Sequence, residues 1–440
     1  MHKLSLSLAV ALSAVTLCSP ALAKDYYVSA NRGRGKKATK KKPAKDLGNI
    51  ISKLQPGDTV HIAEGTYLGR GENGSNTIDV PVSIIGGYSD DFSKRDPWGA
   101  HKTILSGNNL TQNYTPQPAL KIDLMKSHFK NIQGCEFVID GLIIDHGARN
   151  RYQTDKQAKL LLKADPKTGK NPSPSLGGLV IWLNKSGKFD EGPPWKVTVQ
   201  NCIILNTHQN QGALAVSGFR QSTITIRNNA VINHSGTGIF LGSKFHGAKD
   251  KLPKFVVENN TVLFSADSGM SQGFSLFMDT DLEATIKNNV FAFSDIYALN
   301  NGKKTKNVLL MNNLVAGARK ADYVEGDMKM DIEEMIDEAE LVHEDSDGNF
   351  SKKIKIPVSA EWAKVYGSRV VVDREKAEAG IKAKNSDANS LRSMLGLPLD
   401  AGSVKWPKID VYLPRISVED GVKAASTQYE GKGSGKALIK

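Results

Sequence analysis

The chain has 440 residues, with 58 Lys or Arg against 46 Asp or Glu, and its formal net charge at pH 7 is +12. An apolar content of 40% is ordinary for a folded protein, and only three cysteines are present, which excludes a disulfide-rich scaffold. The excess of positive charge favours polyanionic partners such as acidic glycans, lipopolysaccharide or extracellular nucleic acid, unless it serves solubility alone.

The N-terminus has the pattern of a secretory signal peptide. His2 and Lys3 precede an almost uniformly apolar run over residues 4–17, and Ala21-Leu22-Ala23 forms a small-x-small cleavage site. The apolar run is too short to span a bilayer, and no later stretch approaches the roughly 20 apolar residues that a span requires. We therefore expect residues 1–23 to be a signal peptide and the mature protein to be secreted or periplasmic, with no membrane span.

Two cysteines remain in the mature chain. Cys135 and Cys202 either pair in an oxidising compartment or stay as two small buried side chains. Neither lies in a CxxC pattern or at metal-ligand spacing from a histidine, so the sequence predicts no structural zinc.

The first predicted elements of the mature chain are short. Residues 26–29 are expected to form a strand, residues 46–54 a capping helix, and residues 55–62 the next strand. A basic stretch separates the first strand from the helix. Its cations are Arg32, Arg34, Lys36, Lys37, Lys40, Lys41, Lys42 and Lys45. We expect a mobile, solvated loop here, with an anion-binding finger as the alternative.

Five segments in the middle of the chain repeat one pattern: alternating β-branched residues, then an asparagine, then a new strand. The first asparagine of each segment lies at Asn201, Asn228, Asn259, Asn288 and Asn312, in steps of 27, 31, 29 and 24 residues. Steps of this size are typical of solenoids, in which loops of different length leave a constant frame.

The repeat predicts stacked parallel strands rather than hairpins. Inward apolar residues alternate with outward polar ones, as Ile224 and Ile226 do with Thr225. Asparagine tolerates the left-handed backbone of a sharp corner, and corner amides on coils about 4.8 Å apart can hydrogen-bond along the stack. The residues after each asparagine pair begin another strand at once, without the glycine of a hairpin turn.

The pattern resembles the pectin-lyase-like superfamily of right-handed parallel β-helices, which carries an asparagine ladder at one turn. Residues 84–89 and 103–107 also resemble first coils of bacterial β-helix proteins. The resemblance covers residues 25–320 and implies an all-β, single-stranded right-handed parallel β-helix over residues 24–325, with an N-terminal capping helix. It implies the fold but no particular function, because the superfamily holds lyases, hydrolases, epimerases, adhesins and inert spikes.

The composition changes after Asp327. Residues 330–341 are acidic with helical spacing, residues 360–394 are partly helical in pattern, and residues 431–440 are rich in glycine and lysine. We expect residues 326–440 to form a partly helical C-terminal segment that caps the open end of the helix and packs along its side. Its last ten residues are expected to form a flexible tail.

Three histidines are predicted to stack at the third turn of successive coils. Aligned by the asparagine corners, this turn carries His146, His208 and His234, followed by Asp267 and Asp295. In the superfamily this turn borders the face on which substrates lie. Stacked histidines suit anion contact, proton transfer or a weakly held metal, although histidine is also a tolerated turn residue.

The neighbouring strands are expected to present an outward column that could contain Trp182, Phe240 and Phe277. A register shift of one residue would place these rings in the core. We expect Phe277 to pack inward and Trp182, which lies close to Lys185, to be exposed. A long basic insertion over residues 148–177 adds Arg149 and Arg151 near this face, and long loops in compact domains are often functional.

Eliminative cleavage of a uronate polymer needs a cation for the carboxylate, a base for the C5 proton and a donor to the leaving oxygen. Asp267, Asp279 and Asp281 are the candidate ligands of Ca²⁺, the candidate cofactor. The candidate catalytic residues are His234, His208, Lys244 and Arg220. The candidate substrate-binding residues are Trp182, Lys185, His146, Arg149 and Arg151.

No complete catalytic signature accompanies these residues. Ile144-Asp145-His146 lacks the context of the pectate lyase motif that it resembles, and Asp279 with Asp281 does not supply the aspartate cluster of a hydrolase. The leading hypothesis is a monomeric β-helix that binds an acidic polysaccharide or other extracellular polyanion and could cleave it by β-elimination. The alternatives are a noncatalytic, adhesin-like surface or matrix scaffold and a periplasmic metal-handling β-helix.

Overall fold

A computed structural model of the protein describes residues 23–69, 74–106, 118–125, 136–145, 178–183, 194–209, 212–243, 251–266, 272–333, 338–359 and 416–439. Residues 1–22 of the predicted signal peptide, Cys135 and the whole 148–177 insertion lie outside these ranges. Cys202 is a fully buried free thiol, and burial raises its pKa to about 12. None of the helices in the described ranges is both long and apolar enough to cross a bilayer.

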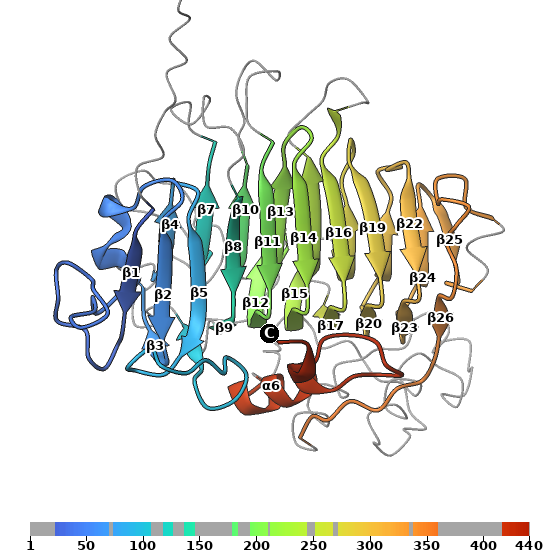
Figure 1. Ribbon diagram of the computed structural model, residues 1–440. Helices are drawn as coiled ribbons and strands as arrows, with labels where there is room; N and C mark the ends of the chain where they lie inside the picture. Colours follow the sequence, from blue (N-terminus) through green and yellow to red (C-terminus); the bar gives the residue numbers. More distant parts are fainter. Residues whose placement is uncertain are drawn as a thin grey trace, which may run out of the picture.

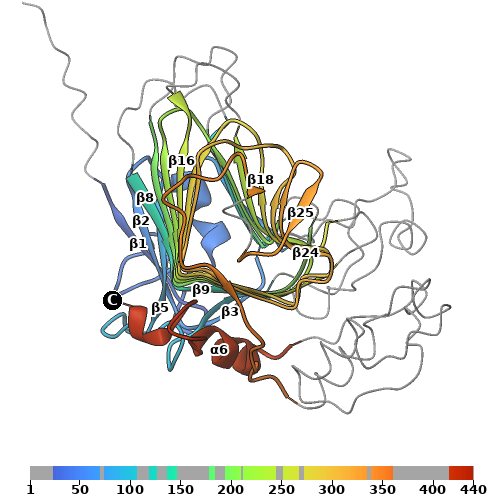
Figure 2. The same ribbon diagram turned by 90° about the vertical axis from the view of Figure 1, so that its right-hand side faces the viewer.

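Three parallel sheets run the length of the molecule and form the walls of a β-helix (Figures 1 and 2). Sheet A consists of β1 (Asp25–Val28), β2 (Thr59–Ala63), β5 (Ser83–Tyr88), β8 (Glu136–Asp140), β11 (Lys196–Gln200), β14 (Thr223–Arg227), β16 (Lys254–Glu258), β19 (Glu283–Lys287) and β22 (Val308–Met311).

Sheet B follows sheet A in each coil. It consists of β3 (Gly65–Tyr67), β6 (Thr103–Leu105), β9 (Leu142–Asp145), β12 (Ile203–Gln209), the first part of β15 (Ala230–Ser243), β17 (Thr261–Ala266), β20 (Val290–Ala292), β23 (Leu314–Ala316) and β26 (Phe350–Ser351).

Sheet C completes the coil. It consists of β4 (Asn76–Ile78), β7 (Leu120–Asp123), β10 (Leu179–Trp182), β13 (Leu214–Gly218), the second part of β15, β18 (Phe274–Met278), β21 (Tyr297–Asn301) and β24 (Ala321–Glu325), with β25 (Met328–Met330) antiparallel to β24 at the end. All other strand pairings named here are parallel, and the predicted all-β parallel β-helix is confirmed.

The core is a continuous column of apolar side chains inside the three walls. In sheet A, Val197 lies opposite Ile224, and Ile224 lies opposite Phe255 in the next coil; all three are buried. One hydrophobic cluster extends from Val28 in the first strand to Ile332 beyond the last coil. The apolar side chains that were predicted to point inward therefore fill the interior of the β-helix.

Two adjacent asparagines form four successive corners between sheets A and B, at residues 228–229, 259–260, 288–289 and 312–313, and at the preceding corner Cys202 follows Asn201. The first has a left-handed backbone, with φ of 54° at Asn201 and 53° at Asn259, as the sequence predicts. The second is fully buried and forms the ladder: the Asn260 side-chain amide donates to Asn289 Oδ1 at 3.0 Å and its Oδ1 accepts from Asn229 Nδ2 at 3.0 Å. The expected ladder exists, built from the second asparagine of each pair.

A second ladder, which the sequence did not predict, lies at the bend between sheets B and C. Asn206 and Asn233 also have left-handed backbones, with φ of 52° and 60°, and Asn233 Nδ2 donates to Asn206 Oδ1 at 2.8 Å. Asn206 Nδ2 in turn donates to Asp145 Oδ1 at 2.8 Å. In the following coils Phe264 and Phe293 occupy this bend, and their rings stack with centroids 5.1 Å apart.

The N-terminal end is closed by two short 3₁₀ helices in place of the predicted single helix. These are η1 (Leu47–Asn49), which Asp46 caps by accepting from the Gly48 amide at 2.7 Å, and η2 (Ile51–Lys53). Buried Leu47, Ile50 and Leu54 cover the first coil. The basic stretch before them is folded against β1, contrary to the expectation of a mobile loop.

The C-terminal segment covers both the open end and one wall. Residues 338–359 lie against the last coil, where the Val308 amide donates to the carbonyl of Leu341. Helix α6 (Val418–Ser426) and the turn η7 (Lys436–Leu438) then lie beneath sheet B (Figure 2) and bury its apolar outer face.

The last residues do not form the expected flexible tail. The Gly433 amide donates to the Asn288 carbonyl, and the Gly435 amide donates to Asn228 Oδ1 at 2.8 Å. Ser434 is fully buried between them.

Candidate functional site

The predicted histidine column is not formed by His208 and His234. Thr207 lies opposite His234, whereas His208 lies opposite Ser235, because His208 lies seven residues after Asn201 and His234 only six residues after Asn228. His234 is fully buried, and its Nδ1 lies 2.6 Å from Thr207 Oγ1. Its imidazole is therefore an interior polar group with no access to a polymer outside the helix.

Several other predicted site residues lie outside the described ranges. They are His146, Arg149, Arg151, Lys185, Lys244 and Asp267. Their assignments as substrate-binding, catalytic or metal-binding residues stay predictions. Arg220 follows β13 at the turn from sheet C to sheet A and is half-buried.

Two of the three predicted calcium ligands, Asp279 and Asp281, lie in the described part of the chain and are accessible to solvent. Asp279 directly follows β18, and its Oδ1 accepts from the Thr280 amide at 3.0 Å. Asp281 is exposed and has a left-handed backbone with φ of 58°. Within the ranges that the structure describes, no three His, Cys, Asp or Glu side chains are grouped to hold a metal ion. A calcium site here depends on Asp267 and stays a prediction.

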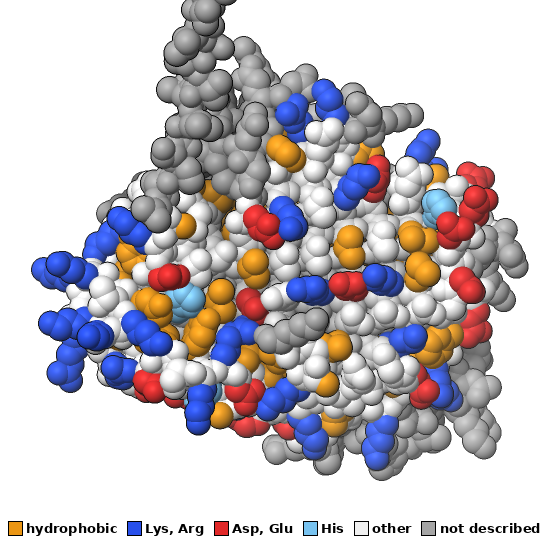
Figure 3. Space-filling view, in the orientation of Figure 1, with side chains coloured by type: hydrophobic (Ala, Val, Ile, Leu, Met, Phe, Trp, Pro, Cys, Tyr) orange, Lys and Arg blue, Asp and Glu red, His pale blue; other side chains and the backbone are white. Residues whose placement is uncertain are grey.

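On the outer face of sheet A, lysine and glutamate side chains of neighbouring strands neutralise one another. Lys196 lies 2.9 Å from Glu136, Lys254 lies 3.3 Å from Glu283, and other pairs continue the row, which is visible across the middle of Figure 3. Exposed pairs of this kind contribute about 0–1 kcal/mol each. Since their charges already have partners, this row is a poor candidate for binding an anion.

The outer face of sheet C combines an aromatic ring with a cation. Trp182, at the end of β10, is half-buried, and Lys121 of the neighbouring strand β7 places its Nζ 3.9 Å from the centre of the indole ring. The same Nζ lies 2.8 Å from Asp123 Oδ2, which faces Trp182 across the strand pair. The expected outward position of Trp182 agrees with this arrangement.

Further along sheet C, four aromatic rings form a second row. Phe240 and Phe277 lie opposite each other with centroids 5.5 Å apart, and Phe274 lies 6.1 Å from Phe277 and 5.6 Å from Tyr297. Phe240, Phe277 and Tyr297 are half-buried, so the expected inward packing of Phe277 is wrong. Because the rings stack on one another, solvent reaches mainly their edges.

Small residues separate the two groups of rings. Ser217 lies opposite Trp182, and Gly242 follows it in the next coil, where a Cβ would lie 2.5 Å from the Phe240 ring. Coils rise by about 4.8 Å, so Trp182 and Phe240 stand roughly 10 Å apart along the axis. The exposed part of the Trp182 indole can contact the apolar face of a sugar ring, and the edges of Phe240 and Phe277 extend this apolar surface along the axis.

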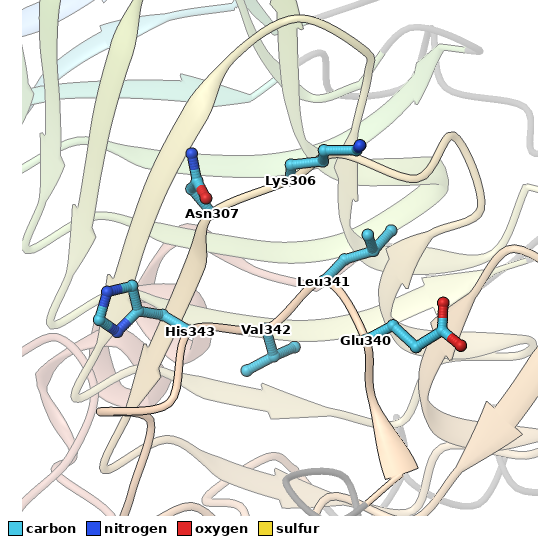
Figure 4. A pocket seen from close by; sticks show the side chains of 6 residues that line it. All are labelled: Lys306, Asn307, Glu340, Leu341, Val342 and His343. Carbon is cyan, nitrogen blue, oxygen red and sulfur yellow. The ribbon is translucent and has the colours of Figure 1, made fainter.

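A pocket near the C-terminal end of the β-helix is a weaker candidate site than this face. It has a volume of about 210 Å³ and is lined by Lys306, Asn307 and residues 340–343. Its side chains point in different directions (Figure 4), and the volume is below that of ordinary ligand sites, about 300–1,000 Å³. The sheet C face therefore remains the stronger candidate.

No family model and no curated protein matches the chain. Among solved structures, a rhamnogalacturonan lyase is similar at 12% identity over 78% of this chain and 92% of its own, with a TM-score of 0.28. The pectate lyase Pel9A is similar at 10% identity over 88% of this chain and 89% of its own, with a TM-score of 0.25. A lacto-N-biosidase from Eubacterium ramulus is similar at 11% identity over 70% of this chain and 68% of its own, again with a TM-score of 0.25. These similarities are too remote to assign an activity or a site to this chain.

Proposed function

We propose that the protein is an exported β-helix that binds an acidic polysaccharide along the outer face of sheet C. The observation that carries the proposal is the contact of Lys121 Nζ with the half-buried ring of Trp182, at 3.9 Å from its centre. A pyranose can stack its apolar face on the exposed part of the indole, and its carboxylate would compete with Asp123, whose Oδ2 lies 2.8 Å from Lys121 Nζ, for the charge of the lysine. The edges of Phe240 and Phe277, two and three coils beyond Trp182, extend the apolar surface along the direction of a bound chain.

Eliminative cleavage is the more specific activity that this face could support. Lys244, the next residue in the sequence after β15, is the candidate base, and Arg220, which follows β13, is a second candidate. Ca²⁺ held by Asp267, Asp279 and Asp281 would acidify the C5 proton by neutralising the uronate carboxylate. The alternative function is a noncatalytic, adhesin-like scaffold, which would bind the polymer through the same face and assign no catalytic role to these residues.

Binding is tested by affinity electrophoresis of the mature protein in gels that contain polygalacturonate, alginate or a neutral glucan. Trp182→Ala should abolish most of the retardation, whereas Trp182→Phe, which keeps a flat ring, should retain it. Lys121→Gln should weaken binding to the two acidic polymers more than to the neutral one, with Lys320→Gln as the control at an exposed position of the last coil. Unchanged migration of Trp182→Ala in every gel would remove the basis of the proposal.

Cleavage is tested separately by incubating the protein with each acidic polymer and following the ultraviolet absorbance of the unsaturated uronate product. A rise that needs Ca²⁺ and is lost in Lys244→Met supports the lyase. No rise with any polymer, with or without Ca²⁺, together with normal retardation in the gels, leaves the noncatalytic scaffold as the function of this face.

A further inference from the structure

The basic loop of residues 31–45 is a concentrated patch of positive charge at the N-terminal end of the helix. All eight of its Lys and Arg side chains are exposed, and within the described residues none of them forms an ion pair with a carboxylate. Two neighbouring carboxylates have other partners: Asp90 accepts from Ser29 Oγ at 2.9 Å and from Asn31 Nδ2 at 2.8 Å, and Asp46 accepts from the Gly48 amide at 2.7 Å. The cluster is visible as the blue side chains at the left of Figure 3.

The backbone of this loop is held in place. The Tyr27 amide donates to the Ala38 carbonyl at 2.8 Å, and the Tyr27 carbonyl accepts from the Ala44 amide at 2.8 Å, so the loop pairs with the free edge of β1. Ala38 and Ala44 are buried in the core cluster. Gly33 passes so close to its neighbours that a Cβ would lie 2.3 Å from the Ser29 carbonyl oxygen. The cations are therefore displayed from a folded platform rather than from a solvated tail.

A folded platform of unpaired like charges is unfavourable by itself. Cations that cannot move apart repel one another, and an anionic partner relieves this repulsion while the backbone loses little further entropy. Six of the eight cations are lysines, which attract anions as point charges without the fixed geometry of an arginine fork. This composition suits a polymer with many regularly spaced negative groups.

An aromatic group adjoins the loop on the outer face of sheet A. The Tyr27 ring stacks on His61 with centroids 4.9 Å apart, and His61 Nδ1 lies 3.1 Å from the Tyr88 hydroxyl. All three side chains are half-buried, which leaves polar and apolar ring atoms open to solvent beside the lysines. The loop itself exposes no large apolar side chain that could insert into a bilayer, since Ala38 and Pro43 are buried.

We propose that residues 31–45, together with Tyr27 and His61, form a second binding surface that holds an acidic polysaccharide chain at a distance from sheet C. The proposal shares the polymer class of the proposed function but uses a different surface. Lysines collect the carboxylates, and the aromatic group contacts the sugar rings. A long chain that contacts both surfaces gains avidity that a short oligomer cannot.

The test compares two variants of the mature protein with equal charge. The loop variant carries Lys36→Gln, Lys37→Gln, Lys40→Gln, Lys41→Gln and Lys42→Gln. The control variant carries Lys303→Gln, Lys306→Gln, Lys320→Gln, Lys329→Gln and Lys353→Gln, all at exposed positions toward the other end. Each set of five substitutions lowers the formal net charge of the protein by five. Because every substituted side chain is exposed, both variants should unfold at the wild-type temperature.

The dissociation constant for long-chain polygalacturonate is then measured at low and high ionic strength. The loop variant should bind about tenfold more weakly at low salt and lose most of its salt dependence, whereas the control should change by no more than about twofold. Trigalacturonate, too short to reach both surfaces, should bind both variants as it binds the wild type. Loss of trigalacturonate binding in Trp182→Ala alone would show that the two surfaces act separately.

Three results would overturn the inference. Equal weakening of both variants would mean that total charge, not the loop, attracts the polymer. Wild-type binding by the loop variant would mean that the loop takes no part. Loss of binding only to phosphatidylglycerol vesicles or to DNA, with polygalacturonate binding intact, would assign the loop to a different partner. A loop effect that persists when wild-type protein binds no trigalacturonate would instead refute the sheet C proposal and leave this one standing.

Discussion

At four successive corners between sheets A and B, two adjacent asparagines serve different physical needs. Asn259 supplies a left-handed backbone, with φ of 53°, and its side chain is half-buried. Asn260 is fully buried, and its amide links the coils before and after it through Asn229 and Asn289. One residue makes the bend and the other satisfies the buried polar groups that the bend creates.

The two positions should therefore respond differently to substitution. Asn260→Ala leaves the Ile226 carbonyl and the Asn229 amide without their partners, and should lower the free energy of unfolding by about 2 to 4 kcal/mol. Asn259→Gly keeps the left-handed backbone accessible and should change it by less than about 1 kcal/mol. Urea denaturation of both variants checks this, and equal losses at the two positions would contradict the division of roles.

A buried carboxyl near the C-terminal end should make stability depend on pH. Burial raises the pKa of Asp322 from its ordinary value of 3.8 to about 6, with a small opposing effect from the Ile332 amide. Ionisation is thus harder in the folded state, so the group destabilises the fold increasingly as the pH rises from 4 to 6 and by a constant amount above that.

Asp322→Asn should relieve this penalty. We expect it to raise the free energy of unfolding by about 2 kcal/mol near pH 8 and by much less near pH 4, where the carboxyl is protonated in both states. Urea denaturation at the two pH values measures the difference. An effect of the same size at both would show that the charge of Asp322 is not its cause.

At the scale of elements, the C-terminal segment behaves as a cover for sheet B. The outer side chains of this wall, including Leu205, Ile232 and Leu263, are buried beneath it. Helix α6 approaches so closely that a Cβ on Gly421 would lie 2.7 Å from Leu205. The Ile416 amide and carbonyl both bond to the side chain of Asn206, at 3.0 Å, which joins this segment to the second ladder.

Removal of residues 416–440 should expose this apolar wall. The truncated protein should bind a hydrophobic dye, associate with itself and unfold at a lower temperature than the full chain. Dye fluorescence and sedimentation velocity would detect the change. Serine substitution of exposed Leu68, which directly follows β3, is the control and should alter neither measurement. A truncated protein that remains monomeric and does not bind the dye would argue against the covering role.

At the scale of the whole molecule, the fold was predictable because its signal is periodic. A corner asparagine recurs in five successive coils, beginning at Asn201, and it can be recognised without knowledge of loop length. The predicted boundaries of single elements were less accurate, because the capping helix became two 3₁₀ turns and the last ten residues became part of the cover.

The candidate site was harder to predict because side-chain direction depends on each bend. His234 lies six residues after Asn228 and therefore faces Thr207, which lies six residues after Asn201, whereas His208 lies seven residues after it; the predicted column ignored this difference of one residue. The outward direction of Phe277 likewise depends on the backbone conformation of β18, where Phe277 pairs with Phe240 of the preceding coil. Lys121 was missed because its distance from Trp182 in the sequence, 61 residues, hides a contact made across adjacent strands.

The cover on sheet B also determines when the fold can be completed. Its final residues bond to Asn228 and Asn288 and, through Lys436, to Asp96, so the part of the chain made last fastens coils made much earlier. A growing chain can stack its coils in order, but the apolar outer face of sheet B stays exposed until the C-terminal segment folds over it. When the chain is synthesised or exported with its N-terminus first, the outer face of sheet B must therefore be kept from associating with other copies until the C-terminal segment has folded.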